Sequence, residues 1–205
     1  VHIEEYRPSF FAFDIVEKGV PTAHIRLAVP GRHNIYNALA AYACAAMFGC
    51  TSGQCKSGLE AFRGAGRRFE FLGEVNGVTI ADDYAHHPAE LEATLTSAAK
   101  MDYRKVWAVF QPFTYSRTQM LLDDFVRVLS IADHVVLTEI MGSREKAEDY
   151  NIRTEDLAAK IPGSVCFSTF EEVTDYVMKN AQPGDLVITL GCGDIYKAAK
   201  MMCRS

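Results

Sequence analysis

The segment DDYAHHP at residues 82–88 crowds two carboxylates, a phenol and two imidazoles into six positions. A carboxylate at the end of a strand, as Asp82 or Asp83 would be, suits ribose hydroxyls, because it accepts hydrogen bonds from both hydroxyls of a vicinal diol. An imidazole a few residues further on, His86 or His87, could position a nucleophile, accept its proton or stabilise a charged intermediate. The structural alternative is that Asp82 or Asp83 caps a helix beginning at Pro88, with the histidines on the surface. The single residues leave both interpretations open, whereas the cluster as a whole favours a functional site.

A second group of chemically capable residues lies in FQPFTYSRT at residues 110–118. Arg117 would stand in the first turn of a helix capped by Ser116 or a neighbour, where the helix dipole disfavours a cation. A carboxylate or phosphate partner would explain that placement, since a guanidinium binds both as a forked donor. The alternative is a solvated arginine paired with Asp123 or Asp124. The position directly after an expected strand favours a functional role for Arg117.

Three weaker signals complete the set of candidates. Asn34 and Asn37 lie three apart at a helix start, so their carboxamides could read an adenine edge together. The alternative is that Asn34 caps the helix and Asn37 is bonded locally. Arg67 and Arg68 could hold a nucleotide, or they could be ordinary linker charge. The glycines of GCG at residues 191–193 could bring backbone amides to an anion, but a tight turn between strand and helix explains them better.

These residues need a scaffold, and from Arg68 onward strand-like apolar runs alternate with helical stretches. The expected strands are FEFLGEV, GVTIADDY, KVWAVFQ, HVVLTEI, SVCFST and DLVITLG. Helices are expected over residues 88–101, 116–129, 154–161 and 170–180, with a last helix ending at Met202. The alternation predicts an α/β fold with a Rossmann-like, mostly parallel, doubly wound sheet. Such sheets bind ligands at the carboxyl ends of their strands, which is where the candidate residues stand.

Residues 1–66 follow a different pattern. The runs SFFAFDIV and AHIRLAV, separated by a Lys-Gly-Val-Pro turn signal, predict a hairpin of two strands. An Ala-rich helix follows, with Asn34 placed to cap its first turn and Gly49 to end its last, and its apolar residues all round predict burial. A second helix is expected over Thr51–Phe62. The stretch RGAGR then marks a boundary between domains expected over residues 1–66 and 67–205.

Composition limits the classes of partner. With 26 acidic against 21 basic residues and a net charge of −5, the chain has no basic field to hold nucleic acid by counterion release. Its 49% apolar and 23% charged residues are typical of a globular protein, and no apolar run is long enough to span a bilayer. Six cysteines without a C-x-x-C pair predict free thiols and no metal site. We expect a cytoplasmic protein, and a chain that begins at Val1 inside a strand-like stretch suggests that upstream sequence is missing.

Read in order, several motifs of this chain are similar to those of one family: GRHNIYNALAA, GAGRRFE, DDYAHHP, FQPFTYSRT and LGCGDI. Through essentially its whole length the chain resembles the Mur ligase family, and within it most of all the branch that adds L-alanine. DDYAHHP and FQPFTYSRT are the elements most specific to that branch and its near relatives. The resemblance implies the C-terminal part of a three-domain ligase. Residues 1–66 would be the end of its central ATP-binding domain, and residues 67–205 its amino-acid-binding domain.

The resemblance also implies roles for individual residues. Those expected to bind ATP, from the adenine to the ribose, are His33, Asn34, Asn37, Arg68 and Asp83. Those expected to form the amino-acid pocket are Tyr84, His86 and Arg117. His86 and Arg117 are also the expected catalytic residues, with Arg117 suited to the substrate carboxylate.

The reaction that the resemblance implies is an ATP-dependent amide ligation in peptidoglycan precursor synthesis. ATP would phosphorylate the carboxylate of UDP-N-acetylmuramate, and the amine of L-alanine would then attack the acyl phosphate. Mg²⁺ would be the metal cofactor, with its ligands upstream of this chain. The chain departs from the family in two respects: members often carry a histidine where Phe113 stands, and no G-x-x-G-K-[ST] phosphate loop occurs here. We therefore expect no ligation by this chain alone.

Two other functions stay open at this point. A relative that attaches a tripeptide to muramate during cell-wall recycling shares much of the pattern, so the amine substrate could be a peptide. A nucleotide-binding or regulatory module without chemistry would also use a Rossmann-like sheet. A comparison of free L-alanine with a tripeptide separates the first alternative, and an upstream phosphate loop in the complete gene excludes the second.

Overall fold

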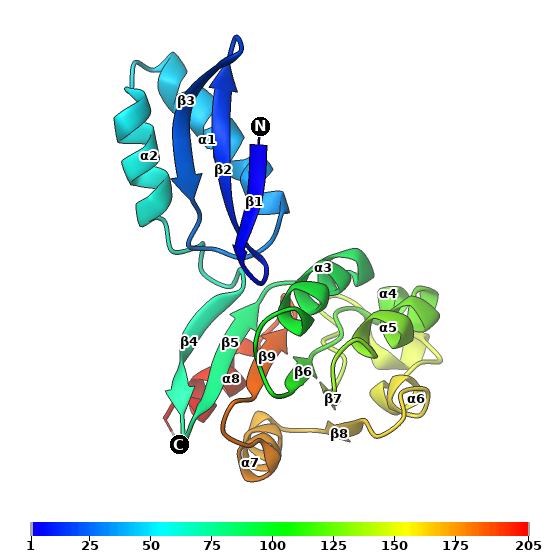
Figure 1. Cartoon of the computed structure of the whole chain (residues 1–205). Coiled ribbons are helices and arrows are strands. Elements are labelled where there is room, and N and C mark those ends of the chain that lie inside the picture. Colours follow the sequence, from blue (N-terminus) through cyan, green and yellow to red (C-terminus); the bar gives the residue numbers. More distant parts are fainter. Residues whose placement is uncertain (1, 205) are drawn as a thin grey trace. The chain divides into compact units, whose positions relative to one another are not determined.

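The computed structural model describes residues 2–204, and the chain divides into two compact units. The first unit ends at Ala65 and the second begins at Gly66. Each unit has its own sheet and its own hydrophobic core (Figure 1). Among the described residues, no helix is long and apolar enough to cross a membrane.

The first unit is a three-stranded antiparallel sheet packed against two helices. Its strands are β1 (His2–Arg7), β2 (Phe10–Glu17) and β3 (Val20–Arg26), in that order across the sheet. The predicted hairpin is formed by β2 and β3, which turn through Lys18 and Gly19, both with positive φ. The helices are α1 (His33–Met47) and α2 (Ser52–Ala61), and α2 begins with a capping box between Thr51 and Gln54.

Helix α1 differs from the sequence prediction in two respects. Asn34 does not cap it: the cap position is Arg32, and no side chain there bonds to the first turn. The Asn34 Nδ2 donates instead to the carbonyl oxygen of Pro30 at 2.7 Å. The helix is not buried all round either, because within the first unit it packs on the sheet through one stripe only. Met47, for example, is 85% exposed.

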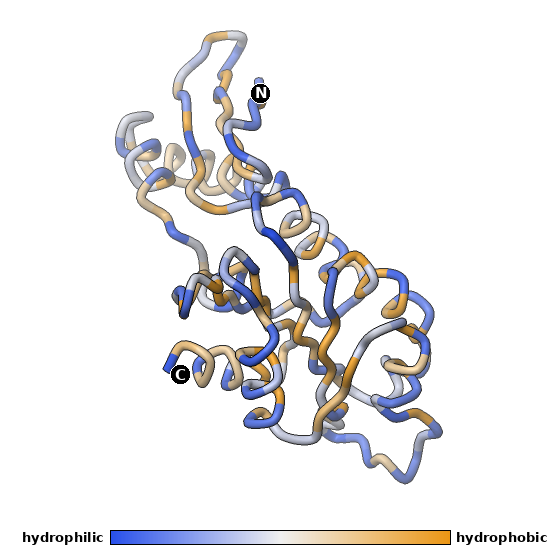
Figure 2. The backbone as a smooth tube through the Cα atoms, turned by 60° about the horizontal axis from the view of Figure 1, so that its bottom comes forward, coloured by the Kyte–Doolittle hydropathy of each residue, from blue (hydrophilic) through white to orange (hydrophobic). Residues whose placement is uncertain are grey.

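The second unit is a six-stranded sheet in the order β4-β5-β9-β6-β7-β8, parallel except for the antiparallel pair β4 and β5. The strands are β4 (Glu70–Val75), β5 (Val78–Asp83), β6 (Val106–Phe110), β7 (His134–Thr138), β8 (Val165–Phe167) and β9 (Leu186–Leu190). Strands β6 and β9 are buried at every residue, which explains why they read as apolar runs without alternation. Figure 2 shows the middle of this sheet among the most hydrophobic parts of the chain.

Helices cover both faces of this sheet. They are α3 (Pro88–Ala99), α4 (Tyr115–Met120), α5 (Leu122–Leu129), α6 (Thr154–Ala158), α7 (Phe170–Asn180) and α8 (Tyr196–Met202), with a 3₁₀ turn at Ala147–Asp149. Alternate residues of β6 belong to two separate cores, one shared with α3, α5 and α6 and the other with α7 and α8. This is the doubly wound, mostly parallel α/β fold that the alternation of strands and helices predicts.

Two features of the second unit were not predicted. The helix expected over residues 116–129 is broken into α4 and α5 at Leu121, whose side chain packs against the core. The last strand, β9, inserts between β5 and β6 and pairs in parallel with both. Strand order depends on long-range packing, so the alternation pattern could not reveal it. The insertion brings the residues after β5, β9 and β6 to one edge of the sheet.

Candidate functional site

Three segments meet at the carboxyl ends of β5, β9 and β6, and together they are called the carboxyl rim here. They are residues 84–87 after β5, residues 191–193 after β9 and residues 111–117 after β6. The last residues of β5 and β6 both align with Leu190, the last residue of β9. Segments far apart in the sequence are therefore side by side at the edge where doubly wound sheets bind ligands.

The neighbouring carboxylates Asp82 and Asp83 have separate tasks, because successive strand residues face opposite sides of a sheet. Asp82 is fully buried and accepts a hydrogen bond from the Thr189 hydroxyl at 2.6 Å. Asp83 is 6% exposed and accepts the backbone N–H groups of Phe69 and Ala85, each at 2.7 Å. Asp83 thus ties the residue that precedes β4 to the turn that follows β5, before any ligand is considered.

The titration of Asp83 gives a testable prediction. Burial raises the pKa of this carboxyl, and the two N–H bonds and the charge of Arg68 offset the rise only in part. An acid with a raised pKa stabilises the fold most when protonated, and that contribution is lost as the pH rises above its ordinary value of 3.8. We expect the free energy of unfolding, relative to Asp83→Asn, to fall as the pH rises through the range just above 3.8. Urea titrations of both proteins at a series of pH values measure this difference, and a difference that grows with pH would contradict the assignment.

Helix α3 is capped by His87, so the alternative that an aspartate caps it is wrong. The His87 Nδ1 accepts the N–H of Ala89, and the Glu90 carboxylate accepts the N–H groups of His86 and His87. Burial acts to raise the pKa of Glu90, but these bonds and the electrostatic effect of the nearby His86 and Arg68 side chains outweigh it and leave the pKa lowered. Glu90 is therefore an anion at neutral pH, and it lies 3.3 Å from the His86 Nδ1.

Arg67 ties the start of the second unit to the loop after β9. Its Nε donates to Asp82 at 2.8 Å, and its Nη2 and Nη1 donate to the carbonyl oxygens of Gly191 and Gly193 at 2.6 and 3.1 Å. All three guanidinium nitrogens are thus bonded within the unit. Arg68 is exposed, and its guanidinium makes no hydrogen bond or ion pair within residues 2–204. Of the two neighbours, Arg68 is the one with donors free for a ligand, and its nucleotide-binding role stays a prediction.

The loop after β9 packs closely on Gln111, and at Gly191 the contact is with backbone, so a side chain there would be strained. Gly191 has a φ of 142°, and a Cβ added there would lie 2.9 Å from the Gln111 carbonyl oxygen. A Cβ on Gly193 would lie 2.5 Å from both the Gln111 Oε1 and the Met141 Sδ. The two glycines therefore serve a tight turn, which is the explanation that the sequence favoured over an anion-binding site.

His86 and Arg117 approach each other across the ring of Phe113. The ring centroids of His86 and Phe113 are 6.2 Å apart in an edge-on arrangement, and the Arg117 Cζ lies 6.0 Å from the Phe113 centroid. On the other side of His86, the Tyr84 ring centroid is 5.7 Å away. Tyr84, His86 and Arg117, which come from two distant segments, therefore lie along one series of contacts, and their roles in a pocket stay a prediction.

Backbone pairing beyond β6 holds Phe113 at this place. Phe113 forms a parallel bridge with Met141, which follows β7. The N–H of Met141 donates to the Pro112 carbonyl, and the N–H of Thr114 donates to the Met141 carbonyl, both at 2.9 Å. The aromatic side chain is thus fixed between the imidazole and the guanidinium by the backbone.

The first turn of α4 is fixed by Glu145 and not by a serine cap. The N–H and hydroxyl of Ser116 both donate to the Glu145 carboxylate, at 2.9 and 2.5 Å, and these bonds lower the pKa of Glu145. The cap position is Thr114, which has a left-handed φ of 65° and no side-chain cap bond. Arg117 stands in this turn, so its backbone position is well defined.

The alternative that Arg117 is a solvated arginine paired with Asp123 or Asp124 is wrong. Asp123 pairs with Lys160, and Asp124 pairs with Arg127. The Arg117 Nη1 is buried and, within the described part of the chain, has no hydrogen-bond partner. A buried guanidinium nitrogen without an acceptor is rare in folded proteins and points to an anionic partner from outside the chain.

The nucleotide-binding residues expected in the first unit lie at the start of α1. The Asn37 Nδ2 donates to the Asn34 Oδ1 at 3.0 Å, so the two carboxamides are neighbours, as their spacing predicts. Asn37 is exposed, and its own carbonyl is free to accept a hydrogen bond from an adenine edge. The His33 ring lies over Gly31, where a Cβ would stand 2.5 Å from the ring. These residues fit an adenine contact, which stays a prediction.

A metal ion has no evident place in the described residues. Within residues 2–204, no group of three or more His, Cys, Asp or Glu side chains is arranged to hold one. All six cysteines are free thiols. The residues present do not fit a Mg²⁺ site, so no chemical step below is assigned to a metal held by this chain.

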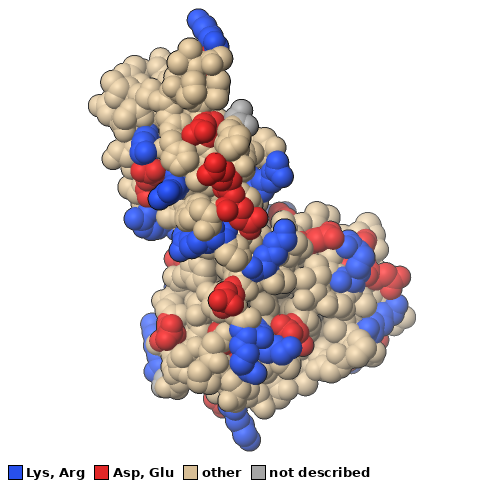
Figure 3. All heavy atoms as spheres, viewed as in Figure 1, with Lys and Arg blue, Asp and Glu red and all other residues tan. Residues whose placement is uncertain are grey.

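Acidic and basic side chains are interspersed on the face shown in Figure 3.

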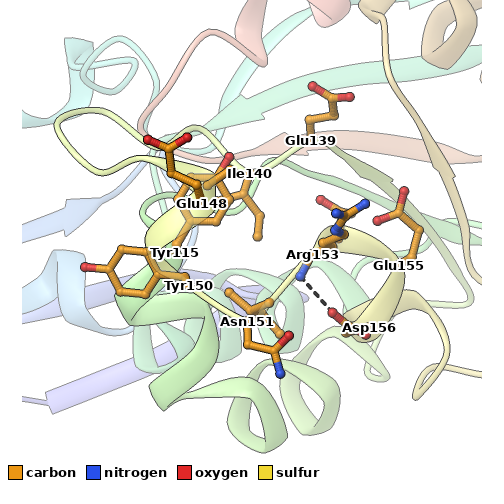
Figure 4. Close-up of a pocket in the computed structure, with 12 residues that line it drawn as sticks. Tyr115, Glu139, Ile140, Glu148, Tyr150, Asn151, Arg153, Glu155 and Asp156 are labelled. Atoms are coloured by element: carbon orange, nitrogen blue, oxygen red, sulfur yellow. Dashed lines mark hydrogen bonds between the residues drawn. The ribbon is translucent and has the colours of Figure 1, made fainter.

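A cavity of about 790 Å³ lies beside α4 at the carboxyl end of β7 (Figure 4). The stacked rings of Tyr115 and Tyr150, with centroids 5.9 Å apart, form part of its wall. Acidic side chains also line it: Glu139, Glu148, Glu155 and Asp156. Arg153 is the basic residue among them. This acidic cavity was not predicted from the sequence, and its charge is opposite to that of Arg117 on the rim.

Comparison with known proteins places this geometry in a family. Residues 67–193 match the family model described as Mur ligase, glutamate ligase domain. The match begins at Arg67 and ends at Gly193, so it contains the whole carboxyl rim.

Two sequence relatives are UDP-N-acetylmuramate–L-alanine ligases. The chain is 43% identical over 199 residues to that of Acetivibrio thermocellus and 46% identical over 192 residues to that of Lachnospira eligens. The alignments cover 95% and 92% of this chain, and the chain spans 42% of the length of each relative.

Solved structures show the same fold. The UDP-N-acetylmuramate–alanine ligase of Thermotoga maritima has a TM-score of 0.80 at 23% identity, covering 98% of this chain and 44% of that one. A murein peptide ligase of Psychrobacter arcticus has a TM-score of 0.63 at 24% identity, covering 98% of this chain and 43% of that one. At these identities the structures establish a shared fold and do not distinguish between amine substrates.

Proposed function

The chain belongs to the Mur ligase family, and from this premise we propose that it is part of an ADP-forming ligase that joins L-alanine to UDP-N-acetylmuramate. Such a reaction would serve peptidoglycan precursor synthesis. The chain spans 42% of its sequence relatives and has no phosphate-loop motif. The complete reaction is therefore proposed for a longer protein that contains this chain, and the chain alone is expected to be inactive.

The observation that carries the proposal is the position of Arg117 beside His86 on the carboxyl rim. The Arg117 Nη1 is buried and lacks an acceptor among the described residues, and a carboxylate is a matched partner for a guanidinium fork. An amino acid bound there by its carboxylate would present its amine to the rim. Tyr84, His86 and Phe113, which contact one another in series, would form a wall of that pocket.

ATP binding is proposed for residues of each unit. His33, Asn34 and Asn37 of the first unit would contact the adenine. In the second unit, Arg68 would contact the nucleotide and Asp83 its ribose, since each Asp83 oxygen keeps a lone pair beyond its backbone bond. The Mg²⁺ that the resemblance implies would have its ligands outside this chain, because the described residues do not fit a metal site.

In the proposed chemistry, this chain binds the amino acid whose amine is the nucleophile. ATP would phosphorylate the muramoyl carboxylate, and the amine would displace phosphate from the acyl phosphate to form the amide, with ADP and phosphate released. Arg117 would fix the amino acid by its carboxylate and so restrict the approach of the amine. His86, whose Nδ1 lies 3.1 Å from the Tyr84 carbonyl oxygen and 3.3 Å from Glu90, would take the proton that the amine loses.

A tripeptide is the second candidate for the amine substrate. The cavity beside α4 favours it, because about 790 Å³ would accommodate further residues of a peptide (Figure 4). Its carboxylate lining, however, would repel an acidic peptide. Free L-alanine is therefore the favoured substrate.

The test of the proposal is ADP release by the full-length protein with ATP and UDP-N-acetylmuramate. We expect turnover with L-alanine, and a kcat/KM at least about tenfold lower with a tripeptide that begins with L-alanine. The reverse order of substrates would support the tripeptide candidate. Turnover with neither amine would support a nucleotide-binding module without chemistry, and turnover by the 205-residue chain alone would refute its expected inactivity.

We also propose a cytoplasmic location for the chain. All six cysteines are free thiols, including Cys44 and Cys50, which are exposed. Exposed thiols persist in a reducing compartment. A cytoplasmic location would also supply the ATP that the proposed reaction needs.

A further inference from the structure

Two buried polar side-chain atoms on the carboxyl rim lack partners. They are the Oε1 of Gln111 and the Nη1 of Arg117, neither of which has a hydrogen-bond partner within residues 2–204. Gln111 as a whole is only 8% exposed. Buried atoms of this kind are few in native proteins, and each calls for a physical explanation.

Two further buried atoms without hydrogen-bond partners, on Thr174 and Asp185, lie away from the rim. Thr174 is in helix α7, and Asp185 precedes β9 at the opposite edge of the sheet, where its Oδ1 lies 2.9 Å from the Arg104 Nε. The rim is thus the part of the described chain where an unpartnered donor and an unpartnered acceptor occur together.

Both side chains interact with the loop after β9, Gln111 by contact and Arg117 electrostatically. The Gln111 Oε1 lies against Gly193, where an added Cβ would be 2.5 Å from it. Arg117 lies near the preceding residue, Cys192: burial raises the pKa of that thiol, and the positive charges of Arg117 and Arg67 oppose the rise. Gln111 and Arg117 are also held on one segment, between β6 and the first turn of α4.

Their chemistry is complementary to one class of ligand. The Gln111 Oε1 is a neutral acceptor, and the Arg117 Nη1 is a cationic donor. A ligand that satisfies both has a carboxylate and an N–H donor, as an α-amino acid does. We propose that Gln111 binds the amine of the amino-acid substrate while Arg117 binds its carboxylate, an inference that rests on the proposed ligase function.

A neutral acceptor suits an amine that must act as a nucleophile. A carboxylate at this place would favour the ammonium form, whose lone pair is occupied by a proton. The amide oxygen of Gln111 orients an N–H without that electrostatic effect, so the amine loses its proton more readily. Both rim atoms are shielded from solvent, so the amino acid reaches them only after a side-chain movement.

The experiment compares Gln111→Met, Gln111→Glu and the control Gln119→Met in the full-length protein. Gln119 is an exposed glutamine of α4 outside the rim's contacts. With ATP and UDP-N-acetylmuramate saturating, Gln111→Met should raise the KM for L-alanine by about tenfold, the effect of one hydrogen bond. The KM for UDP-N-acetylmuramate and inhibition by propionate, which has a carboxylate and no amine, should stay within about twofold.

Gln111→Glu, which keeps the shape of the side chain, gives a second and independent result. The acidic limb of the kcat/KM profile for L-alanine should move to higher pH by about one unit. An unchanged KM in Gln111→Met, or an unchanged pH profile in Gln111→Glu, would overturn the role of Gln111 while leaving the ligase function intact. Failure of the unaltered protein to use L-alanine would overturn the proposed function, and this inference with it.

Discussion

Replacing Arg67 with alanine is expected to lower the free energy of unfolding of the second unit by about 3–5 kcal/mol, since it leaves the buried Asp82 charge unpaired. The Asp82 side chain is 1% exposed and loses its partner at 2.8 Å. The carbonyl oxygens of Gly191 and Gly193 lose their donors in the same change. The β9 loop, and with it the carboxyl rim, would loosen.

Arg68→Ala is the matched control for this prediction. The Arg68 guanidinium makes no hydrogen bond or ion pair in the described part of the chain. Its removal should therefore lower the free energy of unfolding by less than about 0.5 kcal/mol. Urea unfolding followed by the fluorescence of Trp107, the single tryptophan, reports on β6 and therefore on the second unit. Equal effects of the two substitutions would show that the Arg67 contacts do not stabilise the unit.

Arg117→Ala is expected to weaken strongly the binding of L-alanine by the full-length protein. Loss of one partner of a shielded, hydrogen-bonded charge pair costs about 2–5 kcal/mol, which is a rise of at least about 30-fold in the KM for L-alanine. The KM values for ATP and UDP-N-acetylmuramate should change far less, because the proposal gives Arg117 no contact with either. Steady-state ADP release at varied L-alanine concentration measures the effect.

The control for Arg117 is Arg127→Ala on the next helix. Arg127 is exposed and pairs with Glu92, and an exposed pair contributes little. Its substitution should leave all three KM values within about twofold. An Arg117→Ala protein with an unaltered KM for L-alanine would remove the guanidinium from the amino-acid site.

The sheet could be predicted from the sequence because its signal is local. Apolar runs alternate with helical stretches, and glycines or polar residues mark nearly every strand end. The position of β9 could not be predicted, since nothing in LVITL specifies pairing with both β5 and β6. The break at Leu121 was missed for a similar reason: the helical pattern continues through it, and packing against the core decides the break.

Most residues of the candidate site could be identified from the sequence, but the contacts between them could not. Strand periodicity puts Asp82 and Asp83 on opposite faces, a signal present in the sequence that would have separated their tasks. Nothing local distinguishes Arg67 from Arg68, because Asp82 lies 15 residues from Arg67 and its other two partners, Gly191 and Gly193, lie more than a hundred residues along the chain. Gln111 gave no signal, since its unpartnered oxygen is a property of the folded rim.

Glu90 and the acidic cavity illustrate two further limits. Glu90, three residues after His87, follows the spacing of a capping box, but a histidine is an unusual cap and hid that pattern. The cavity is assembled from the residues after β7, the start of α6 and Tyr115 of α4. A composite of separate loops has no sequence motif of its own.

A crystal structure of the full-length protein with L-alanine tests most directly whether the amino acid binds on the carboxyl rim. We predict a carboxylate oxygen within about 3.2 Å of an Arg117 guanidinium nitrogen, with the amine directed toward Gln111 and His86. L-alanine bound in the acidic cavity beside Tyr115 and Tyr150, or on the first unit, would contradict this account.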